Sequence, residues 1–137
     1  MRVLIVDDEP LARMRLATLL GECEGAELAG SVGDGEAALA ALDELKPDLL
    51  LLDINMPGLD GMALAARLAG RARPQVVFCT AYENHALHAF ELEAVDYLLK
   101  PVRLERLREA LQRANKRLAE TPRAAVAYLH ARVRDEQ

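Results

Sequence analysis

Acidic side chains stand directly after two separate apolar runs of the sequence. Asp7 and Asp8 follow the run at 3–6, and Asp53 follows the four leucines at 49–52. Carboxylates repel one another, so gathering all three in one cleft requires a cation, a shared proton or a lysine. Oxygen ligands without imidazole or thiolate favour Mg²⁺, with Mn²⁺ as a surrogate. These residue types therefore indicate a divalent-cation site.

A hydroxyl and an amino group follow two further apolar runs: Thr80 comes after 76–79 and Lys100 after 97–99. Once a metal neutralises the oxygens of both reactants, a carboxylate such as Asp53 can attack phosphorus in line and become an acyl phosphate. Thr80 and Lys100 would each bind a phosphoryl oxygen. Taken singly, each residue is an ordinary cap or loop residue. Their joint placement after four apolar runs points to phosphoryl chemistry.

Five short apolar runs are predicted to form the strands that position these residues. Four of them, at 3–6, 49–52, 76–79 and 97–99, are continuous, which is typical of strands buried on both faces. The run at 27–32 is more polar and suits an edge strand. Each is followed by a helical pattern, and this alternation implies a parallel sheet with helices on both faces. Such folds place their site at the carboxyl ends of the strands.

Helix boundaries are also marked in the sequence. Pro10 suits the first turn of a helix, while Asp34 and Asp60 are candidate N-caps. The third helix should end at about Ala69, before Gly70, and a short fourth helix is expected at 85–92. The last helix carries an apolar stripe, which comprises Leu104, Leu107, Leu111, Ala114 and Leu118.

Composition excludes several classes of protein. The 137 residues suit one domain, and 52% hydrophobic with 28% charged residues argues against disorder. A net charge of −5 without a basic run predicts no direct nucleic-acid contact. Cys23 and Cys79 are expected to be buried apolar residues, since two cysteines make neither a disulfide framework nor a zinc site. No stretch suits a membrane span or secretory signal, so a cytoplasmic protein without membrane contact is expected.

Four motifs carry a resemblance to a known family. V-D-D-E-P at 6–10, L-L-D-I-N-M-P-G-L-D-G at 51–61, C-T-A-Y at 79–82 and D-Y-L-L-K-P at 96–101 resemble the receiver domain of bacterial two-component response regulators. The stretch 78–102 is similar to the LytTR (LytR/AlgR-type) class. The resemblance implies a flavodoxin-like doubly wound α/β fold of five βα units with strand order 2-1-3-4-5. It places the receiver domain at 1–120 and a linker or helical tail at 121–137.

The resemblance also assigns roles around the predicted cation. Asp53 would be the phosphoacceptor and would receive its phosphoryl group from a sensor histidine kinase. Asp8, Asp53 and the backbone carbonyl of Asn55 would bind Mg²⁺ directly, and Asp7 would reach it through water. The chain would be a switch that assists its own phosphorylation and dephosphorylation, and not an enzyme in the usual sense.

Further roles concern the switch. The resemblance implies that Thr80 and Lys100 hold the phosphoryl group and that a cis peptide bond precedes Pro101. Phosphorylation would draw Thr80 inward and rotate Tyr97. Asn55 and Tyr82 would tune the phosphoryl lifetime, with Tyr82 hindering the attacking water.

Phosphorylation is expected to produce a homodimer through the face formed by the fourth helix, the fifth strand and the fifth helix. The charged residues predicted for that face are Glu91, Asp96, Arg103, Arg106, Arg108 and Arg113. LytTR members usually carry a C-terminal DNA-binding domain, so DNA contact is expected only through such a domain, which is missing from this sequence. The alternative is a stand-alone regulator that acts through protein–protein contacts.

Other readings fit the residues less well. An aspartyl phosphatase of the haloacid-dehalogenase type needs a second Asp where Asn55 stands, and a flavin module needs a phosphate loop where 7–9 are acidic. A receiver-like scaffold that is never phosphorylated would not need the complete acceptor set.

The three histidines, His85, His88 and His130, are expected to be surface residues. Thr121-Pro122 should end the last helix, and the stripe of Val126, Leu129 and Val133 suggests a linker, a docking helix or a frayed end.

Overall fold

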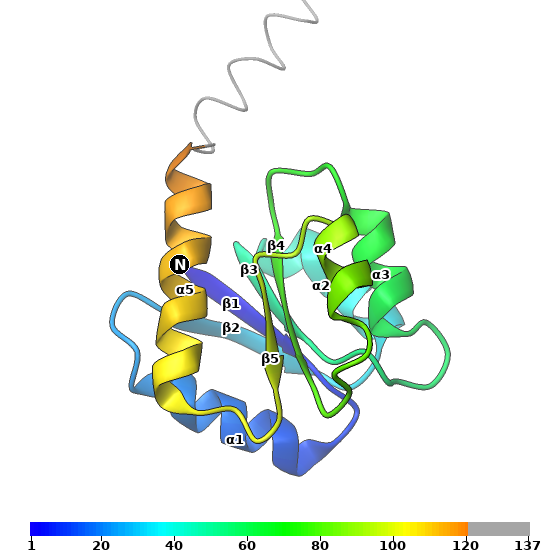
Figure 1. Ribbon diagram of the computed structural model, residues 1–137, viewed down its shortest axis with the longest axis horizontal. Helices are drawn as coiled ribbons and strands as arrows, with labels where there is room; N and C mark the ends of the chain where they lie inside the picture. Colours follow the sequence, from blue (N-terminus) through cyan, green and yellow to red (C-terminus); the bar gives the residue numbers. More distant parts are fainter. Residues whose placement is uncertain (121–137) are drawn as a thin grey trace, which may run out of the picture.

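The computed structural model of the protein describes residues 1–120, which form one five-stranded parallel sheet (Figure 1). The strands are β1 (Arg2–Val6), β2 (Glu27–Val32), β3 (Leu49–Leu52), β4 (Gln75–Thr80) and β5 (Asp96–Leu99). Their order is β2-β1-β3-β4-β5, and every neighbouring pair is parallel. The predicted flavodoxin-like fold is therefore confirmed, including the more polar second run as an edge strand.

Helices cover both faces of the sheet (Figure 1). Helices α1 (Pro10–Gly21) and α5 (Leu104–Glu120) lie on one face. Helices α2 (Gly35–Leu45), α3 (Gly61–Leu68) and α4 (Ala86–Glu91) lie on the other. This two-sided cover explains why the central strands are continuously apolar, because successive side chains of a strand point to opposite faces.

The alternation divides the core into two clusters. Val3 and Ile5 of β1 pack with Leu20 of α1 and Leu107 of α5. Leu4, on the opposite side of the same strand, packs with the residues of α2, α3 and α4. All eight residues at 3–6 and 49–52 are fully buried. Burying apolar side chains on both faces is the main stabilising contribution to this fold, at roughly 25 cal/mol per Å² of apolar surface.

The predicted helix starts are confirmed by the caps. Asp34 accepts a hydrogen bond from the Ala37 amide at 2.7 Å, and Asp60 accepts one from the Ala63 amide at 2.8 Å. These bonds satisfy amides that the first helical turn leaves unpaired. The third and fourth helices differ from the prediction by one residue at their ends, which is within the usual variation of helix boundaries.

Strand register brings the ends of the strands together. Val6 of β1 is opposite Leu52 of β3, and Thr80 of β4 is opposite Leu99 of β5. Backbone pairing continues one residue further, because the Asp53 amide donates to the Val6 carbonyl at 2.9 Å. The Lys100 amide likewise donates to the Thr80 carbonyl at 2.8 Å. The predicted chemical residues therefore begin where the sheet ends.

Smaller expectations are also met within the described residues. Cys23 and Cys79 are buried free thiols, and burial raises the pKa of Cys79 to about 12. The Lys100–Pro101 peptide bond is cis, as is the unpredicted Arg73–Pro74 bond. Among the helices of residues 1–120, none has the length and apolar character needed to cross a membrane. The prediction for 121–137, including His130 and the stripe from Val126 to Val133, lies outside the described residues.

Candidate functional site

An acidic cluster lies at the carboxyl end of the sheet, where β1 and β3 end. Oxygen atoms of Asp7, Asp8 and Asp53 all lie within 4.8 Å of one another. Asp7 and Asp53 are buried, with 1% and 5% of their surfaces exposed, while Asp8 is exposed. The three predicted carboxylates are therefore close enough to share one cation, and the exposed Asp8 gives that place access to solvent.

Lys100 places one positive charge inside the cluster. Its Nζ donates to Asp7 Oδ2 at 2.7 Å and to Asp53 Oδ2 at 3.3 Å. Burial by itself lowers the pKa of Lys100, but the hydrogen bond that it donates to Asp7 and the charge of Asp53 outweigh this effect, so the pKa is raised. Lys100 is therefore a fixed cation that contacts two of the three clustered carboxylates, those of Asp7 and Asp53.

Asp53 lies in the environment expected of a reactive carboxylate. Its Oδ1 accepts the Ile54 amide at 2.8 Å, which leaves Oδ2 with only the longer contact to Lys100. Burial raises the pKa of Asp53, the charge of Lys100 lowers it, and the charge of Asp7 raises it again, so the pKa stays above its ordinary value. The negative charge on Asp53 is thus incompletely compensated, and an added cation would stabilise it.

Backbone packing fixes the loop that carries Asp53. The first residue of α3, Gly61, donates its amide to the Ile54 carbonyl at 2.9 Å. A Cβ at Gly61 would lie only 2.0 Å from the Asp53 carbonyl oxygen. Only glycine allows α3 to begin so close to this strand end. Asn55 lies exposed in the same loop, two residues after Asp53.

Thr80 and Tyr97 are linked through the backbone of Tyr82. The Thr80 hydroxyl is fully buried and accepts the Tyr82 amide at 3.3 Å. The Tyr97 hydroxyl donates to the Tyr82 carbonyl, and its ring lies 6.1 Å from that of Phe78 between centroids. Burial raises the pKa of Tyr97. The structure therefore connects the two residues predicted to act as the switch.

Arg13 is a neighbour of the acidic cluster that the sequence reasoning missed. Its Nη1 donates to the main-chain carbonyl of Asp7 at 2.6 Å. The spacing of α1 puts Arg13 one turn after Glu9, whose carbonyl accepts the Arg13 amide. The one signal in the sequence for Arg13 was its position one helical turn after the acidic run. That spacing does not show which backbone atom the long arginine side chain contacts.

The predicted interaction face is arranged differently from expectation. Asp96 is nearly buried and pairs within the same chain with Arg106 at 3.1 Å and Arg113 at 2.9 Å. The placement of Arg108 on this face is wrong, because its guanidinium donates to the Glu22 carbonyl beside α1. Arg106 and Arg113 are seven residues apart and share one side of α5, whereas a residue two positions from Arg106 points to nearly the opposite side.

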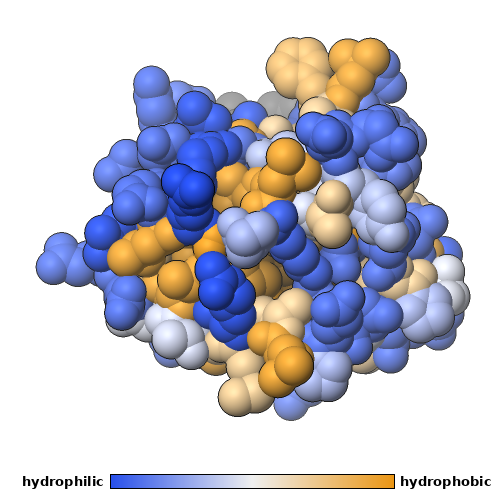
Figure 2. Space-filling view, turned by 60° about the horizontal axis from the view of Figure 1, so that its bottom comes forward, coloured by the Kyte–Doolittle hydropathy of each residue, from blue (hydrophilic) through white to orange (hydrophobic). Residues whose placement is uncertain are grey.

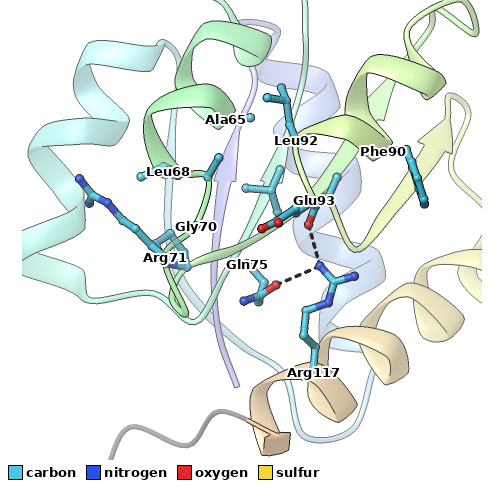
Figure 3. Close-up of a pocket in the computed structure, with 13 residues that line it drawn as sticks. Ala65, Leu68, Gly70, Arg71, Gln75, Phe90, Leu92, Glu93 and Arg117 are labelled. Atoms are coloured by element: carbon cyan, nitrogen blue, oxygen red, sulfur yellow. Dashed lines mark hydrogen bonds between the residues drawn. The ribbon is translucent and has the colours of Figure 1, made fainter. Parts of the chain in front are cut away.

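Two views place these features on the molecule. Figure 2 brings the lower side of Figure 1 forward, where the strands end, and shows mainly hydrophilic side chains around a smaller area in which hydrophobic ones reach the surface. A separate cavity of about 480 Å³ lies between the end of α3, the start of β4 and the end of α4 (Figure 3). Arg117 spans its edge, donating to Gln75 Oε1 at 3.3 Å and to the Glu93 carbonyl at 2.6 Å. None of the predicted site residues lines this cavity.

Comparison with known proteins gives consistent matches. The family model described as the response regulator receiver domain matches residues 3–112. The positive alginate biosynthesis regulatory protein of Pseudomonas aeruginosa is 58% identical over 118 residues, which are 85% of this chain and 48% of that protein. The transcriptional regulatory protein BtsR of Escherichia coli K12 is 44% identical over 112 residues, 82% of this chain and 47% of that protein.

A solved structure agrees with these matches. The response regulatory domain of protein mrkE from Klebsiella pneumoniae is 42% identical and superposes with a TM-score of 0.80, covering 88% of this chain and 100% of that one. The chain spans about half the length of the curated relatives that it matches.

Proposed function

This chain belongs to the response regulator receiver domain family, and from that premise we propose that Asp53 accepts a phosphoryl group from a sensor histidine kinase in a Mg²⁺-dependent reaction. The similarity to the Pseudomonas aeruginosa regulator agrees with the LytTR-type resemblance. The observation that carries the proposal is the cluster itself. A buried Asp53 lies within 4.8 Å of two further carboxylates and beside the ammonium of Lys100.

The donor set suits Mg²⁺, or Mn²⁺ in its place. Carboxylate oxygens are hard ligands, and the three negative charges exceed the one positive charge of Lys100. We assign direct contacts to Asp8, Asp53 and the main-chain carbonyl of Asn55. Asp7 suits contact through water, because its Oδ1 already accepts the Glu9 amide and its Oδ2 already accepts Lys100. When bound, the cation would neutralise the phosphoryl oxygens and the carboxylate that must approach them.

The transfer step follows from these positions. An oxygen of Asp53 attacks phosphorus while the bond between phosphorus and the donor's histidine nitrogen breaks, and the nitrogen leaves with the bonding electron pair. The product is an acyl phosphate on Asp53. Lys100 is already within reach of Asp53 and would pair with a phosphoryl oxygen, and the Thr80 hydroxyl would bind another. Water then attacks phosphorus, the bond between phosphorus and the Asp53 oxygen breaks, and inorganic phosphate leaves while the Asp53 carboxylate is restored.

The switch would run from Thr80 to Tyr97. Movement of the Thr80 hydroxyl toward the phosphoryl group would disturb its bond with the Tyr82 amide, and Tyr97 is bonded to the carbonyl of that same residue. Phosphorylation can favour the active form only through such a difference in contacts. Tyr82 is 47% exposed, which suits a role in hindering the attacking water, and Asn55 would share that control of the lifetime.

The output would follow from the surface formed by α4, β5 and α5. Leu87 and Phe90 of α4 are 74% and 79% exposed, and such apolar residues favour a homodimer through this face after phosphorylation. We assign the receiver domain to residues 1–120 and a linker or C-terminal helical tail to 121–137. As a linker, that segment would lead to a C-terminal DNA-binding domain, in keeping with the regulators that are twice as long. A stand-alone regulator acting through protein contacts is the alternative, and the cytoplasm, where receiver domains usually act, is the proposed location.

Intact mass after incubation with acetyl phosphate tests the proposal. We expect one phosphoryl adduct on the wild type with Mg²⁺, and none with EDTA or in Asp53→Asn. Asp43→Asn is the matched control, because Asp43 is exposed on α2 and the same charge is removed. An adduct that persists in Asp53→Asn, or a folded and Mg²⁺-binding wild type that a histidine kinase also fails to phosphorylate, would contradict it.

The same phosphorylated preparation tests the finer assignments. Tyr82→Ala should lose the adduct several-fold faster than the wild type, and sedimentation should show a dimer that Phe90→Ser weakens. An unchanged lifetime would exclude shielding by Tyr82. A dimer that Phe90→Ser leaves intact would exclude this face.

A further inference from the structure

Arg13 holds a position beside the acidic cluster that the proposed phosphoryl transfer does not use. Its guanidinium is partly buried, and Nη1 donates to the Asp7 carbonyl at 2.6 Å, a short and charge-assisted hydrogen bond. The bonded atom belongs to the peptide bond that joins Asp7 to Asp8. Arg13 therefore contacts the backbone of the predicted metal site and not its carboxylates.

The Arg13 guanidinium packs against Gly33, the residue directly after β2. A Cβ at Gly33 would lie 3.2 Å from Nη1 and 3.9 Å from Cζ of Arg13. The neighbouring Val32 carbonyl accepts the Asp7 amide at 3.1 Å. The backbone at Asp7 is thus held from two directions, by the end of β2 and by Arg13, and the missing side chain at Gly33 makes room for the second of these contacts.

Asp8 depends on its backbone more than the other two carboxylates do. Asp7 is fixed by Lys100 and by the Glu9 amide, and Asp53 is fixed by the Ile54 amide. Across the described part of the chain, no hydrogen bond or ion pair holds the Asp8 side chain. The direction in which Asp8 offers its carboxylate is therefore set by the peptide bond that precedes it.

We propose that Arg13 is a positioning residue for the cation site, which it serves by fixing the Asp7–Asp8 peptide bond and through it the Asp8 carboxylate. The inference rests on the proposed function, since it concerns the same Mg²⁺ site. Partners that orient metal ligands from outside the coordination shell contribute about 10- to 100-fold to metal affinity or activity. Because Arg13 acts through the backbone, we expect an effect at the lower end of that range.

Charge and position predict opposite results when Arg13 is replaced. A positive charge this close to the site repels Mg²⁺, so removing it would tighten binding if charge were the whole effect. If position dominates, Arg13→Met weakens Mg²⁺ binding about 10-fold. Arg13→Lys keeps the charge and can still donate a hydrogen bond, although without the planar guanidinium, and it should recover part of the loss.

Gly33 supplies a second and independent test. Gly33→Ala displaces the guanidinium by a few tenths of an ångström and should weaken Mg²⁺ binding several-fold when Arg13 is present. The same change should have no effect in Arg13→Met, because the displaced group is then gone. Gly21→Ala is the matched control, since a Cβ at Gly21 meets nothing within 4 Å.

The experiment is a Mg²⁺ titration of the full 137-residue chain, followed by calorimetry or by backbone amide chemical shifts, with thermal unfolding as the check on folding. The expected result is weaker binding in Arg13→Met, partial recovery in Arg13→Lys, and coupling between positions 13 and 33. Unchanged or tighter Mg²⁺ binding in Arg13→Met, or equal effects of Gly33→Ala with and without Arg13, would overturn the inference. The Mg²⁺ titration and the thermal unfolding do not require Asp53 to be phosphorylated, so failure of the proposed function would be seen separately.

Discussion

The two ends of the sheet treat charge in opposite ways. At the carboxyl end, three carboxylates cluster together, one lysine contacts two of them, and negative charge is left in excess. At the amino end, the carboxylate of Asp48 lies 3.5 Å from Arg73 and accepts the Arg2 amide at 2.8 Å. The Asp48 carboxylate thus has a counter-charge within the chain, although Nε and Nη1 of Arg73 are buried and make no hydrogen bond within the described residues. The carboxyl end of the sheet therefore has negative charge available for a ligand, whereas the charge of Asp48 at the amino end contributes to stability.

The amino end also joins more of the sheet by backbone contacts. Asp48 donates its amide to the Arg2 carbonyl and accepts the Gln75 amide, so one residue connects the starts of β1, β3 and β4. The Arg2 guanidinium donates further to the Leu45 carbonyl at the end of α2. Within residues 1–120, nothing comparable balances Asp53, whose second oxygen has only the 3.3 Å contact with Lys100.

The largest expected difference is in stability. Asp48→Ala removes a mostly buried carboxylate and leaves Arg73 without its counter-charge, so the free energy of unfolding should fall by about 3 kcal/mol. Asp53→Asn removes the same charge at the other end and should leave that free energy unchanged or raise it. Urea denaturation of both variants without metal is the measurement. A comparable loss in Asp53→Asn would show that the acidic end is also held together by its charges.

A smaller effect should appear when Mg²⁺ is added or removed. Binding to the folded state alone raises the free energy of unfolding by about 1.4 kcal/mol at ten times the dissociation constant. In Asp48→Ala, Mg²⁺ should raise the free energy of unfolding by this whole amount, starting from a lower value without metal. In Asp8→Asn and Asp53→Asn, Mg²⁺ should raise it by little. Thermal unfolding with Mg²⁺ and with EDTA measures this. A reduced increment in Asp48→Ala would mean that the two ends are coupled.

The smallest effect concerns pH. Burial, partly opposed by Lys100, holds the pKa of folded Asp53 above its ordinary value of 3.8. Folding is therefore penalised where Asp53 is ionised, and the penalty disappears below 3.8, where both states are protonated. In EDTA, the stability gained by Asp53→Asn should be present at pH 7 and should shrink as the pH falls through that raised pKa. Urea denaturation at several pH values tests this, and a gain that grows in acid would contradict it.

Much of the fold was predictable from short stretches of sequence. The leucines at 49–52 indicated a strand covered on both faces, and Asp34 and Asp60 marked helix starts through their caps. Such signals are local, because they depend on burial period or on a bond to an amide three residues away. The cis bond before Pro74 was not predicted, since proline permits that isomer but the surrounding fold decides it.

The site was predictable to the same extent. Asp7, Asp53 and Lys100 each directly follow a strand, so the rule that parallel strands end together was enough to gather them. Their functional roles remain predictions. Arg13 and Asp96 show what was missing, because the partners of long side chains depend on which elements lie opposite. Helical spacing alone excludes Arg108 from the face of Arg106 and Arg113, because two residues along a helix turn a side chain to nearly the opposite side.

The register of the strands makes the acidic cluster a product of the whole sheet. Asp7 and Asp53 meet because Val6 lies opposite Leu52, and Lys100 joins them because β4 and β5 are also aligned. A chain in which any of these strands has separated has no cluster, so Mg²⁺ should oppose every opening that takes the central strands apart. The hydrogen-exchange rates of the β1 and β3 amides should therefore fall by the whole factor by which Mg²⁺ binding lowers the population of the opened chain. Amides of the short helix α4, which can open while the sheet stays intact, should exchange at the same rate with or without the ion.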